Sequence, residues 1–238
     1  SISSEIRSKR FLDAGPQKIL LSQPASADVD STIIYGLNEG DLKSDHMIVS
    51  AASCTSNCLI PVLDVMERTW GIENGLSTTI HSAMSDQPVI DAYSSDLRRT
   101  RAAVASIIPV DTALPKGIAR IMPHLDGCME SLHLRVPTLN VSAMDLTLQL
   151  NSNVIAVDIN ALLKQHCDGL LKGLIGFTNE PHASVAFNHD ARSGVIDGTQ
   201  TRVSGERLLK LLIWFDNEWG FANRMVDALQ QHAFKQNI

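Results

Sequence analysis

Apolar and polar residues alternate along several short segments of the chain, which predicts half-buried strands there. The clearest example is residues 144–150, where Met144, Leu146, Leu148 and Leu150 alternate with polar residues. Similar runs predict strands at residues 18–22, 31–36, 46–50, 75–81, 130–136, 184–187 and 194–197. Residues 208–215 are mostly apolar, so we expect a central strand there.

Apolar residues three or four positions apart mark the expected helices. These cover residues 1–14, 54–66, 158–167 and 218–234. Near the start, a helix, three strands and a second helix follow one another, an order typical of the trailing edge of an α/β sheet. Residues 82–106 are polar and carry four charged side chains between positions 96 and 101, so we expect a long functional or interfacial loop.

Charge and cysteine content narrow the functional classes. The 238 residues carry a net charge of -6, which argues against general affinity for nucleic acid or an anionic membrane. No apolar run has the length of a membrane span, and we expect no secretory signal at the start of the chain. The four cysteines fit neither a disulfide framework nor a zinc site. We therefore expect no metal and a reducing, cytoplasmic location.

The segment Ser53-Cys54-Thr55-Ser56-Asn57-Cys58 joins a predicted strand to a predicted helix. A Ser or Thr there can cap the helix, which places Cys54 at the positive helix end, where the thiolate is favoured. Cys58 lies one turn further on. The ordinary alternative is a buried pair of structural thiols. His81 likewise has two interpretations: a catalytic base, or an ordinary hydrogen-bonded histidine at a strand end.

Five blocks of sequence occur in a fixed order along the chain. They are residues 52–59 (Ala-Ser-Cys-Thr-Ser-Asn-Cys-Leu), 78–81 (Thr-Thr-Ile-His), 96–99 (Asp-Leu-Arg-Arg), 135–138 (Arg-Val-Pro-Thr) and 216–220 (Asp-Asn-Glu-Trp-Gly). Together they resemble the phosphorylating aldehyde dehydrogenases of the glyceraldehyde-3-phosphate dehydrogenase family, from about Ile19 onward. Family members begin with a complete dinucleotide-binding half, and no Gly-x-Gly-x-x-Gly follows a strand in these residues.

The resemblance implies an α+β fold. We expect a mixed, mostly antiparallel sheet with helices on one side, preceded by the trailing strands of a truncated Rossmann-like α/β domain. The expected divisions are residues 1–52 as a remnant of the NAD-binding domain, residues 53–217 as the catalytic domain and residues 218–238 as a C-terminal helix. Most of the NAD-binding domain is expected to be missing, which would leave this chain inactive by itself.

The resemblance also implies the residues of the site. Cys54 is expected as nucleophile and His81 as base, with an ion pair between them that lowers the pKa of Cys54. The residues expected to bind a phosphorylated aldose are Ser53, Thr55, Arg99, Thr112, Ala113 and Arg135. Asn217 is expected to hold the nicotinamide of NAD, although a turn-forming Asn is the alternative. Cys128 and Cys167 are expected to be structural.

Two regions point to a finer resemblance within the family. Ala83-Met84 and Val110-Asp111-Thr112-Ala113 resemble the subgroup that oxidises D-erythrose 4-phosphate to 4-phosphoerythronate, a role in supplying pyridoxal 5'-phosphate. The alternatives are oxidation of glyceraldehyde 3-phosphate and a catalytically silent module that serves assembly only. The family implies a homotetramer, and we expect at least a dimer, because a sheet face such as residues 144–150 would otherwise be partly uncovered.

Overall fold

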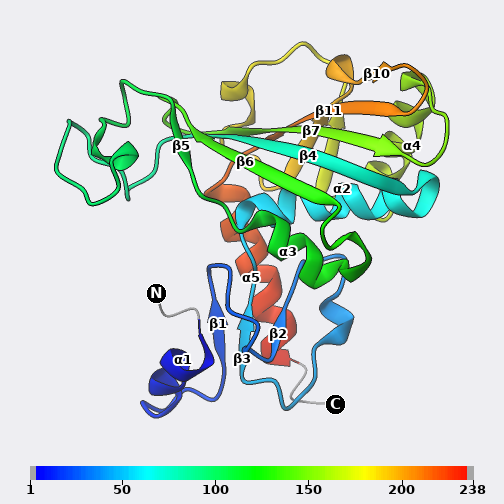
Figure 1. Cartoon of the computed structure of the whole chain (residues 1–238). Coiled ribbons are helices and arrows are strands. Elements are labelled where there is room, and N and C mark those ends of the chain that lie inside the picture. Colours follow the sequence, from blue (N-terminus) through cyan, green and yellow to red (C-terminus); the bar gives the residue numbers. More distant parts are fainter. Residues whose placement is uncertain (1–3, 235–238) are drawn as a thin grey trace.

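The computed structural model describes residues 4–234, so the outermost residues of the first expected helix and of the C-terminal helix lie outside the described part. The larger of its two sheets has eight strands. These are β4 (Ile72–His81), β5 (Ile108–Val110), β6 (Met129–Arg135), β7 (Ser142–Leu150), β8 (Ile175–Thr178), β9 (Gly194–Asp197), β10 (Arg202–Ser204) and β11 (Leu208–Phe215). Figure 1 shows this sheet spanning one end of the molecule.

The large sheet is mixed and mostly antiparallel, as expected. Its order is β5-β6-β4-β7-β11-β9-β8, and β10 pairs with β11. Only the pairs β4/β6 and β8/β9 are parallel. The β4/β6 register sets His81 beside Arg135 and Thr79 beside His133, which brings two distant segments together at one end of the sheet. The central position expected for β11 is confirmed, because it lies between β7 and β9.

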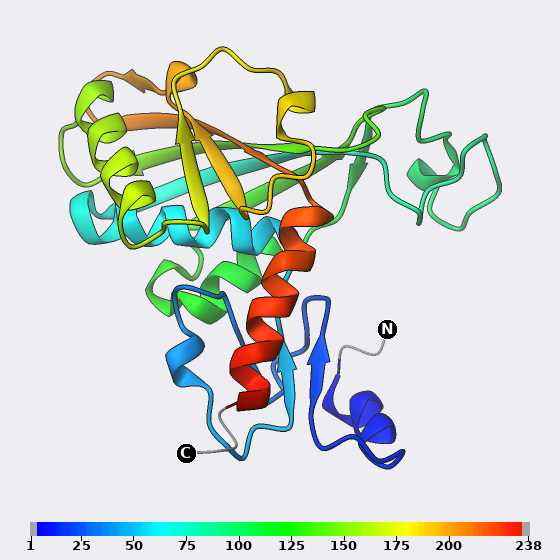
Figure 2. The same ribbon diagram turned by 180° about the vertical axis from the view of Figure 1, so that it is seen from behind.

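The helices α2 (Cys54–Trp70), α3 (Leu114–Ile121) and α4 (Ala156–Asp168) cover one face of this sheet (Figures 1 and 2). The apolar positions of β7 point into the core beneath them, and Met144, Leu146, Leu148 and Leu150 are fully buried. The expectation that this face of residues 144–150 would be uncovered is therefore wrong. The opposite face is the open one, and Leu76 on β4 is 63% exposed there.

A second sheet of three parallel strands precedes the large one, as expected for the end of an α/β domain. Its order is β1 (Ile19–Leu21), β3 (Ile48–Ser50) and β2 (Ser31–Thr32). The helix α5 (Trp219–Phe234) packs against it through a cluster that includes Val49 and Ala228, while α1 (Glu5–Leu12) contacts β1. The C-terminal helix is thus part of the small unit (Figure 2).

Several elements differ from the sequence prediction. Residues 184–187 form a 3-10 helix, η4 (Ser184–Phe187), and the strand expected at residues 31–36 has only two residues. The pattern also missed β5, β8, β10 and α3, because the first three are short and α3 contains Pro115 and Gly117, which normally interrupt helices. The other 3-10 turns are η1 (Glu39–Asp41), η2 (Arg98–Thr100), η3 (Pro123–Leu125) and η5 (Gly198–Gln200).

Residues 82–106 form the predicted long loop, which extends from the body of the molecule in Figures 1 and 2. In residues 4–234, no helix combines the length and the apolar character needed to cross a bilayer. Within the same residues, no three His, Cys, Asp or Glu side chains lie close enough together to hold a metal ion.

Candidate active site

The start of α2 presents Cys54. The strand β3 ends at Ser50, and Ala52 has a positive φ of 60°, which turns the chain sharply into the helix. Ser53 is the N-cap, and its Oγ accepts a hydrogen bond of 3.1 Å from the Ser56 N–H. The predicted cap is confirmed. Cys54 is the first residue of the helix and remains partly exposed, whereas Cys58 is completely buried one turn later.

His81 ends β4 and lies directly against Cys54. Its Nε2 is 3.7 Å from the Cys54 Sγ, within the range of a hydrogen bond that involves sulfur. The side chain is only 2% exposed, and its Nδ1 lies 2.9 Å from the Ser82 carbonyl oxygen. The fold therefore places a nucleophile and a base in contact, which is the arrangement that covalent catalysis requires.

Burial decides the charge of both groups. It raises the pKa of Cys54 to about 11, although the backbone N–H of Thr55 and the charge of Arg135 act in the opposite direction. It also lowers the pKa of His81 to about 4, and the bond to Ser82 offsets this only in part. Near neutral pH the pair is therefore a thiol and a neutral imidazole. The expected ion pair with a lowered Cys54 pKa is wrong for the chain without a ligand, because desolvation exceeds the effect of the helix terminus.

Arg135 is the cation nearest to this pair. It ends β6 next to His81, and its Nη1 lies 2.7 Å from the His81 Nδ1. No other hydrogen bond of the Arg135 guanidinium is found among residues 4–234, so its remaining N–H groups are available to a ligand in the cavity that Arg135 lines. A guanidinium with free donors is suited to bidentate binding of phosphate.

His133 lies one pleat before Arg135 on β6, on the same face. Its ring stacks on His81 with a centroid separation of 5.0 Å and an interplanar angle of 24°. It is buried, and its Nε2 has no hydrogen-bond partner in the described structure. Burial, followed by the proximity of His81 and Arg135, lowers the pKa of His133 to about 3. His81 thus faces a second neutral imidazole.

Asn217 is held in position by two hydroxyl groups. Ser82 and Ser142 both donate to its Oδ1 at 2.8 Å, so its NH2 group is left to face the cavity that Asn217 lines. The residue before it, Asp216, accepts hydrogen bonds from the N–H groups of Trp219 and His189 at 2.8 Å. Asp216 therefore caps the start of α5 and fixes the chain on both sides of Asn217.

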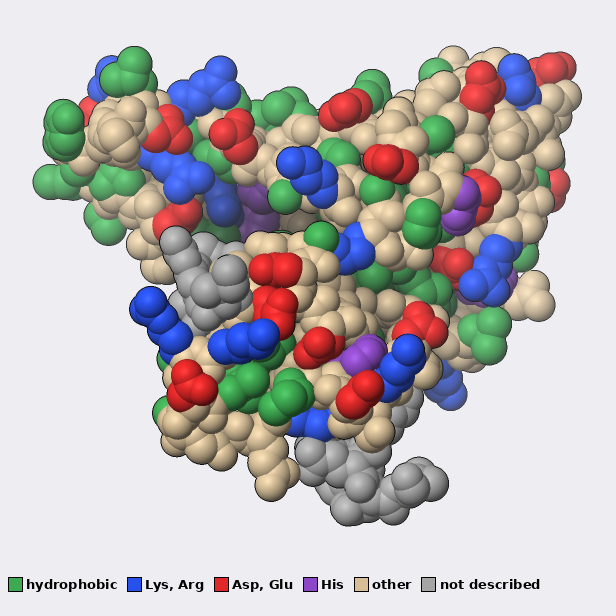
Figure 3. Space-filling model, turned by 60° about the horizontal axis from the view of Figure 1, so that its bottom comes forward, with side chains coloured by type: hydrophobic (Ala, Val, Ile, Leu, Met, Phe, Trp, Pro, Cys, Tyr) green, Lys and Arg blue, Asp and Glu red, His purple; other side chains and the backbone are tan. Residues whose placement is uncertain are grey.

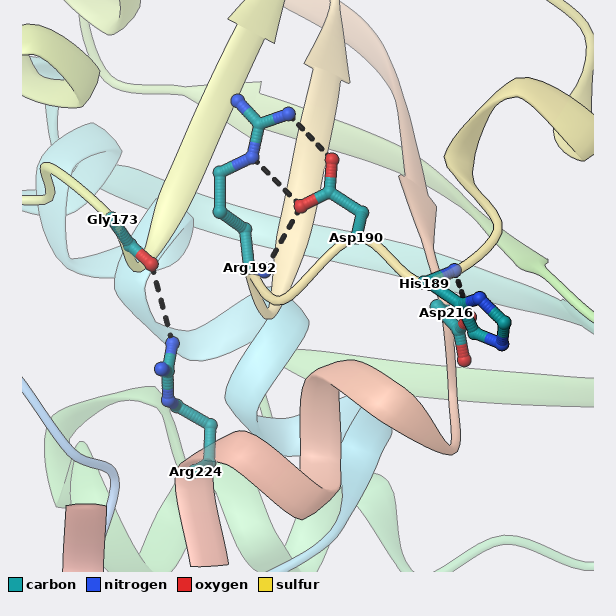
Figure 4. Close-up of polar contacts among 6 residues, drawn as sticks. All are labelled: Gly173, His189, Asp190, Arg192, Asp216 and Arg224. Carbon is teal, nitrogen blue, oxygen red and sulfur yellow. Dashed lines mark hydrogen bonds and ion pairs between the residues drawn. The ribbon is translucent and has the colours of Figure 1, made fainter. Parts of the chain in front are cut away.

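A second polar cluster lies around the start of α5 (Figure 4). Asp190 forms an ion pair with Arg192 just before β9, and Arg224 of α5 donates to the Gly173 carbonyl at 3.4 Å. Gly220 lies against the same segment, because an added Cβ would be 2.5 Å from the Arg192 carbonyl oxygen. Close packing thus ties α5 to the segments that precede β8 and β9.

The side chains of Cys54, His81, His133, Arg135 and Asn217 line a cavity of about 690 Å³ between the two sheets. Figure 3 shows histidine and basic side chains in the hollow there. The sequence matches the family described as glyceraldehyde 3-phosphate dehydrogenase, C-terminal domain, over residues 53–217, which is more than half of the chain. The chain belongs to this family. Its domain is that of an oxidoreductase of the dehydrogenase type.

Most of the residues expected from the family motif lie around this one cavity. They are Ser53, Cys54, Thr55, His81, Thr112, Ala113, Arg135 and Asn217. Arg99 is the exception. It lies on the loop 82–106, paired with Asp96 at 3.2 Å and with Asp86 at 3.5 Å, and it does not line the cavity. In this conformation the loop neutralises Arg99 and leaves Arg135 as the cation beside the base.

The structure adds cavity residues that the sequence alone did not indicate. Lys116 and Phe221 line the cavity from α3 and α5, and His133 lines it from β6. Lys116 was missed because α3 itself was not predicted. His133 could have been suspected from its spacing, since residues two apart on a strand share a face with Arg135. Cys128 and Cys167 lie outside the cavity lining, at a turn and on α4.

Proposed function

We propose that this domain, joined to a dinucleotide-binding half, oxidises D-erythrose 4-phosphate to 4-phosphoerythronate with NAD as the hydride acceptor. The observation that supports it most is the single cavity that combines the Cys54–His81 pair, the free donors of Arg135 and the free amide group of Asn217. The product would serve the synthesis of pyridoxal 5'-phosphate, in the cytoplasm.

The residues suit a thioester mechanism. The Cys54 sulfur forms a bond to the aldehyde carbon, while the thiol proton passes to Nε2 of His81 and on to the former carbonyl oxygen. His81 then removes that hydroxyl proton as the hydride leaves the carbon, which yields a thioester on Cys54. A neutral thiol and a neutral imidazole suit this order of steps, because His81 takes the proton of Cys54 during the attack rather than beforehand.

The cavity wall favours water over inorganic phosphate as the group that cleaves the thioester. Asp111 lines the cavity next to Thr112, and its negative charge repels a phosphate ion from that part of the wall, which follows β5, whereas Arg135 lies on β6. Ala113 carries a methyl group where a glycine would allow close approach to the backbone. Attack by water breaks the bond between sulfur and carbon, releases the carboxylic acid and returns the proton to Cys54.

NAD fits this chain only at its nicotinamide end. The NH2 group of Asn217 is a donor directed to the cavity, suited to the carbonyl oxygen of a carboxamide. When bound, NAD supplies the hydride acceptor. No Gly-x-Gly-x-x-Gly turn occurs in the 238 residues to hold the pyrophosphate.

Kinetics with two sugar phosphates tests the proposal. The measurement is kcat/KM for D-erythrose 4-phosphate and for glyceraldehyde 3-phosphate, with and without inorganic phosphate, on the chain joined to a dinucleotide-binding half. We expect preference for the four-carbon sugar and no phosphate requirement. Preference for the triose with a phosphate requirement would instead establish the phosphorylating activity of the family.

The silent-module alternative is tested on the 238 residues alone. We predict no tight NAD binding by calorimetric titration, because one anchored end of a dinucleotide leaves its pyrophosphate without backbone donors. A micromolar dissociation constant would contradict this prediction. Binding and turnover that appear only after the dinucleotide-binding half is joined would exclude a purely structural role.

A further inference from the structure

One ring nitrogen of His81 has two partners that exclude each other. Its Nδ1 lies 2.9 Å from the Ser82 carbonyl oxygen, which can only accept, and 2.7 Å from the Arg135 Nη1, which can only donate. Bonding to Ser82 requires a proton on Nδ1, and bonding to Arg135 requires a lone pair there. A neutral imidazole has one N–H, so the partner chosen at Nδ1 also decides whether Nε2 carries a proton.

The state of Nε2 decides whether His81 can act. Nε2 faces the Cys54 Sγ at 3.7 Å, and it accepts the thiol proton only when it carries a lone pair. The Arg135 contact is the shorter of the two at Nδ1 and has a charged donor, which makes it the stronger bond. We propose that Arg135 is a positioning residue that holds His81 in the tautomer unable to deprotonate Cys54, and that an anion which draws Arg135 away releases the base.

The surroundings of His81 support such a release. His133 stacks on the ring, so the ring keeps its plane while its partner at Nδ1 changes. The charged and titratable groups near the pair are Cys54 on α2, His133 and Arg135 on β6, and Asp86 and Arg99 on the loop. Asp86 is already shared with Arg99, so Arg135 has no carboxylate of its own and is free to bind an entering anion.

The release moves one proton off Nε2 and one onto Nδ1 by exchange with water in the cavity, and the ring stays neutral throughout. Arg135 then binds the anion, Nδ1–H donates to Ser82, and Nε2 accepts from Cys54. The inference rests on the proposed function in one respect, because a phosphorylated substrate would supply the anion. His81 would then become an active base only when an anion occupies the cavity, so that Cys54 reacts preferentially when a substrate is bound.

The tautomer can be observed directly on the 238-residue chain. The protein is labelled with 15N in its histidines, and long-range proton–nitrogen correlation spectra identify which ring nitrogen of His81 carries hydrogen. Loss of signals in His81→Asn assigns the resonances. Without phosphate we expect the proton on Nε2, with the Nδ1–H form on the order of 10% or less. Saturating inorganic phosphate should make the Nδ1–H form predominant.

Two variants separate this role from a structural one. In Arg135→Met we expect the Nδ1–H form with or without phosphate, whereas Arg68→Met, which removes an exposed arginine of α2 that does not line the cavity, should behave like the parent. The proposal is overturned if the parent carries its proton on Nδ1 without phosphate, if phosphate leaves the tautomer unchanged, or if Arg135→Met keeps the proton on Nε2. Sugar preference does not enter this readout, so failure of the proposed substrate leaves it intact.

Discussion

Cys54 and His81 face each other as neutral groups, because burial moves both pKa values in the direction that removes charge. A helix N-terminus usually favours a thiolate, but its effect is limited to fractions of a kcal/mol up to about 2 kcal/mol, and the loss of water here is the larger influence. The thiol therefore depends on His81 as a base rather than on a lasting ion pair.

The rate of alkylation of Cys54 should show that its thiol is uncharged near neutral pH. With a Cys54 pKa of about 11, the thiolate fraction and the rate with iodoacetamide should rise about tenfold per pH unit between pH 7 and 9. With inorganic phosphate present to release Nε2, His81→Asn should slow the reaction at neutral pH, and Cys58→Ser should leave it nearly unchanged, because Cys58 is fully buried. Peptide mapping by mass spectrometry gives the rates. A plateau below pH 8 would show that the ion pair exists after all.

His133 should make the protein sensitive to acid. Its folded pKa of about 3 lies below the unfolded value near 6.5, so the unfolded chain binds the proton first and stability falls as pH drops from about 6.5 toward 3. Its share of the loss between pH 7 and pH 5 should be on the order of 2 kcal/mol. His133→Leu should reduce the pH dependence of urea unfolding by that amount.

The exposed His182 provides the control for this measurement. His182→Leu should keep the pH dependence of the parent, because this side chain already lies at the surface of the folded chain. If His133→Leu gave the same slope as His182→Leu between pH 7 and pH 5, the low pKa assigned to His133 would be wrong.

At the scale of elements, the sequence was informative wherever a pattern ran long enough. The strands β4, β7 and β11 and the helix α2 each carry a clear periodicity, and all four form where predicted. The helix α3 was not predicted, because Pro115 and Gly117 oppose helix formation locally. It forms because packing of Leu114 and Ile118 in the core stabilises it. Residues 184–187 show the reverse, because a short apolar run does not distinguish a strand from a 3-10 turn.

The site was predictable to the extent that its residues sit in sequence motifs. Cys54, His81, Arg135 and Asn217 were identified this way, and they lie together in the structure. The stack of His133 on His81 follows instead from the parallel register of β4 and β6, two strands separated by about fifty residues of chain. Such a register is a tertiary property, so no local pattern could supply it.

Gly220 should be required for α5 to pack closely against the segment before β9. An added Cβ would lie 2.5 Å from the Arg192 carbonyl oxygen, a backbone atom that can move only with its strand. We expect Gly220→Ala to lower the free energy of unfolding by about 1–3 kcal/mol. Gly40→Ala is the matched control, since a Cβ there meets nothing within 4 Å. Equal urea midpoints for the two variants would contradict the close packing of α5 against this segment.

At the scale of the whole molecule, the cavity depends on both units. Residues 22–27 and Thr32 of the small unit line it together with the start of α2 and the end of β6. Arg120 of α3 joins the units by donating to the Ala25 carbonyl at 2.8 Å and the Thr32 hydroxyl at 3.0 Å. The Cys54–His81 pair is built on the large unit, while the cavity beside it is closed by the small one.

The open face of the large sheet is the feature that bears most directly on assembly. The β4/β6 register sets Thr78 beside Leu132 and Ile80 beside Leu134, and the helices of the core lie on the other side. Leu76 and Leu132 are 63% and 48% exposed on this face. We propose that a second copy of the chain covers it, since an exposed apolar sheet face of this kind typically marks a protein interface.

The loop 82–106 offers a second apolar surface, and this makes a larger assembly possible. Tyr93 is 98% exposed and Leu97 is 83% exposed on this loop, which projects from the body of the molecule (Figure 1). Two separate surfaces of this kind are what a homotetramer of dihedral symmetry needs, one for each type of contact. We propose that the complete protein is a homotetramer that uses both.

Light scattering on the 238-residue chain tests the sheet contact first. We expect at least a dimer for the parent, and Leu76→Lys should shift the mass toward that of a monomer, because a charge would be buried in the contact without a partner. Leu170→Lys changes an 84% exposed leucine after α4, away from the sheet face, and should leave the mass unchanged. A parent that stays monomeric at high protein concentration would show that the sheet face does not pair in this chain, and equal masses for both variants would assign the contact to another surface.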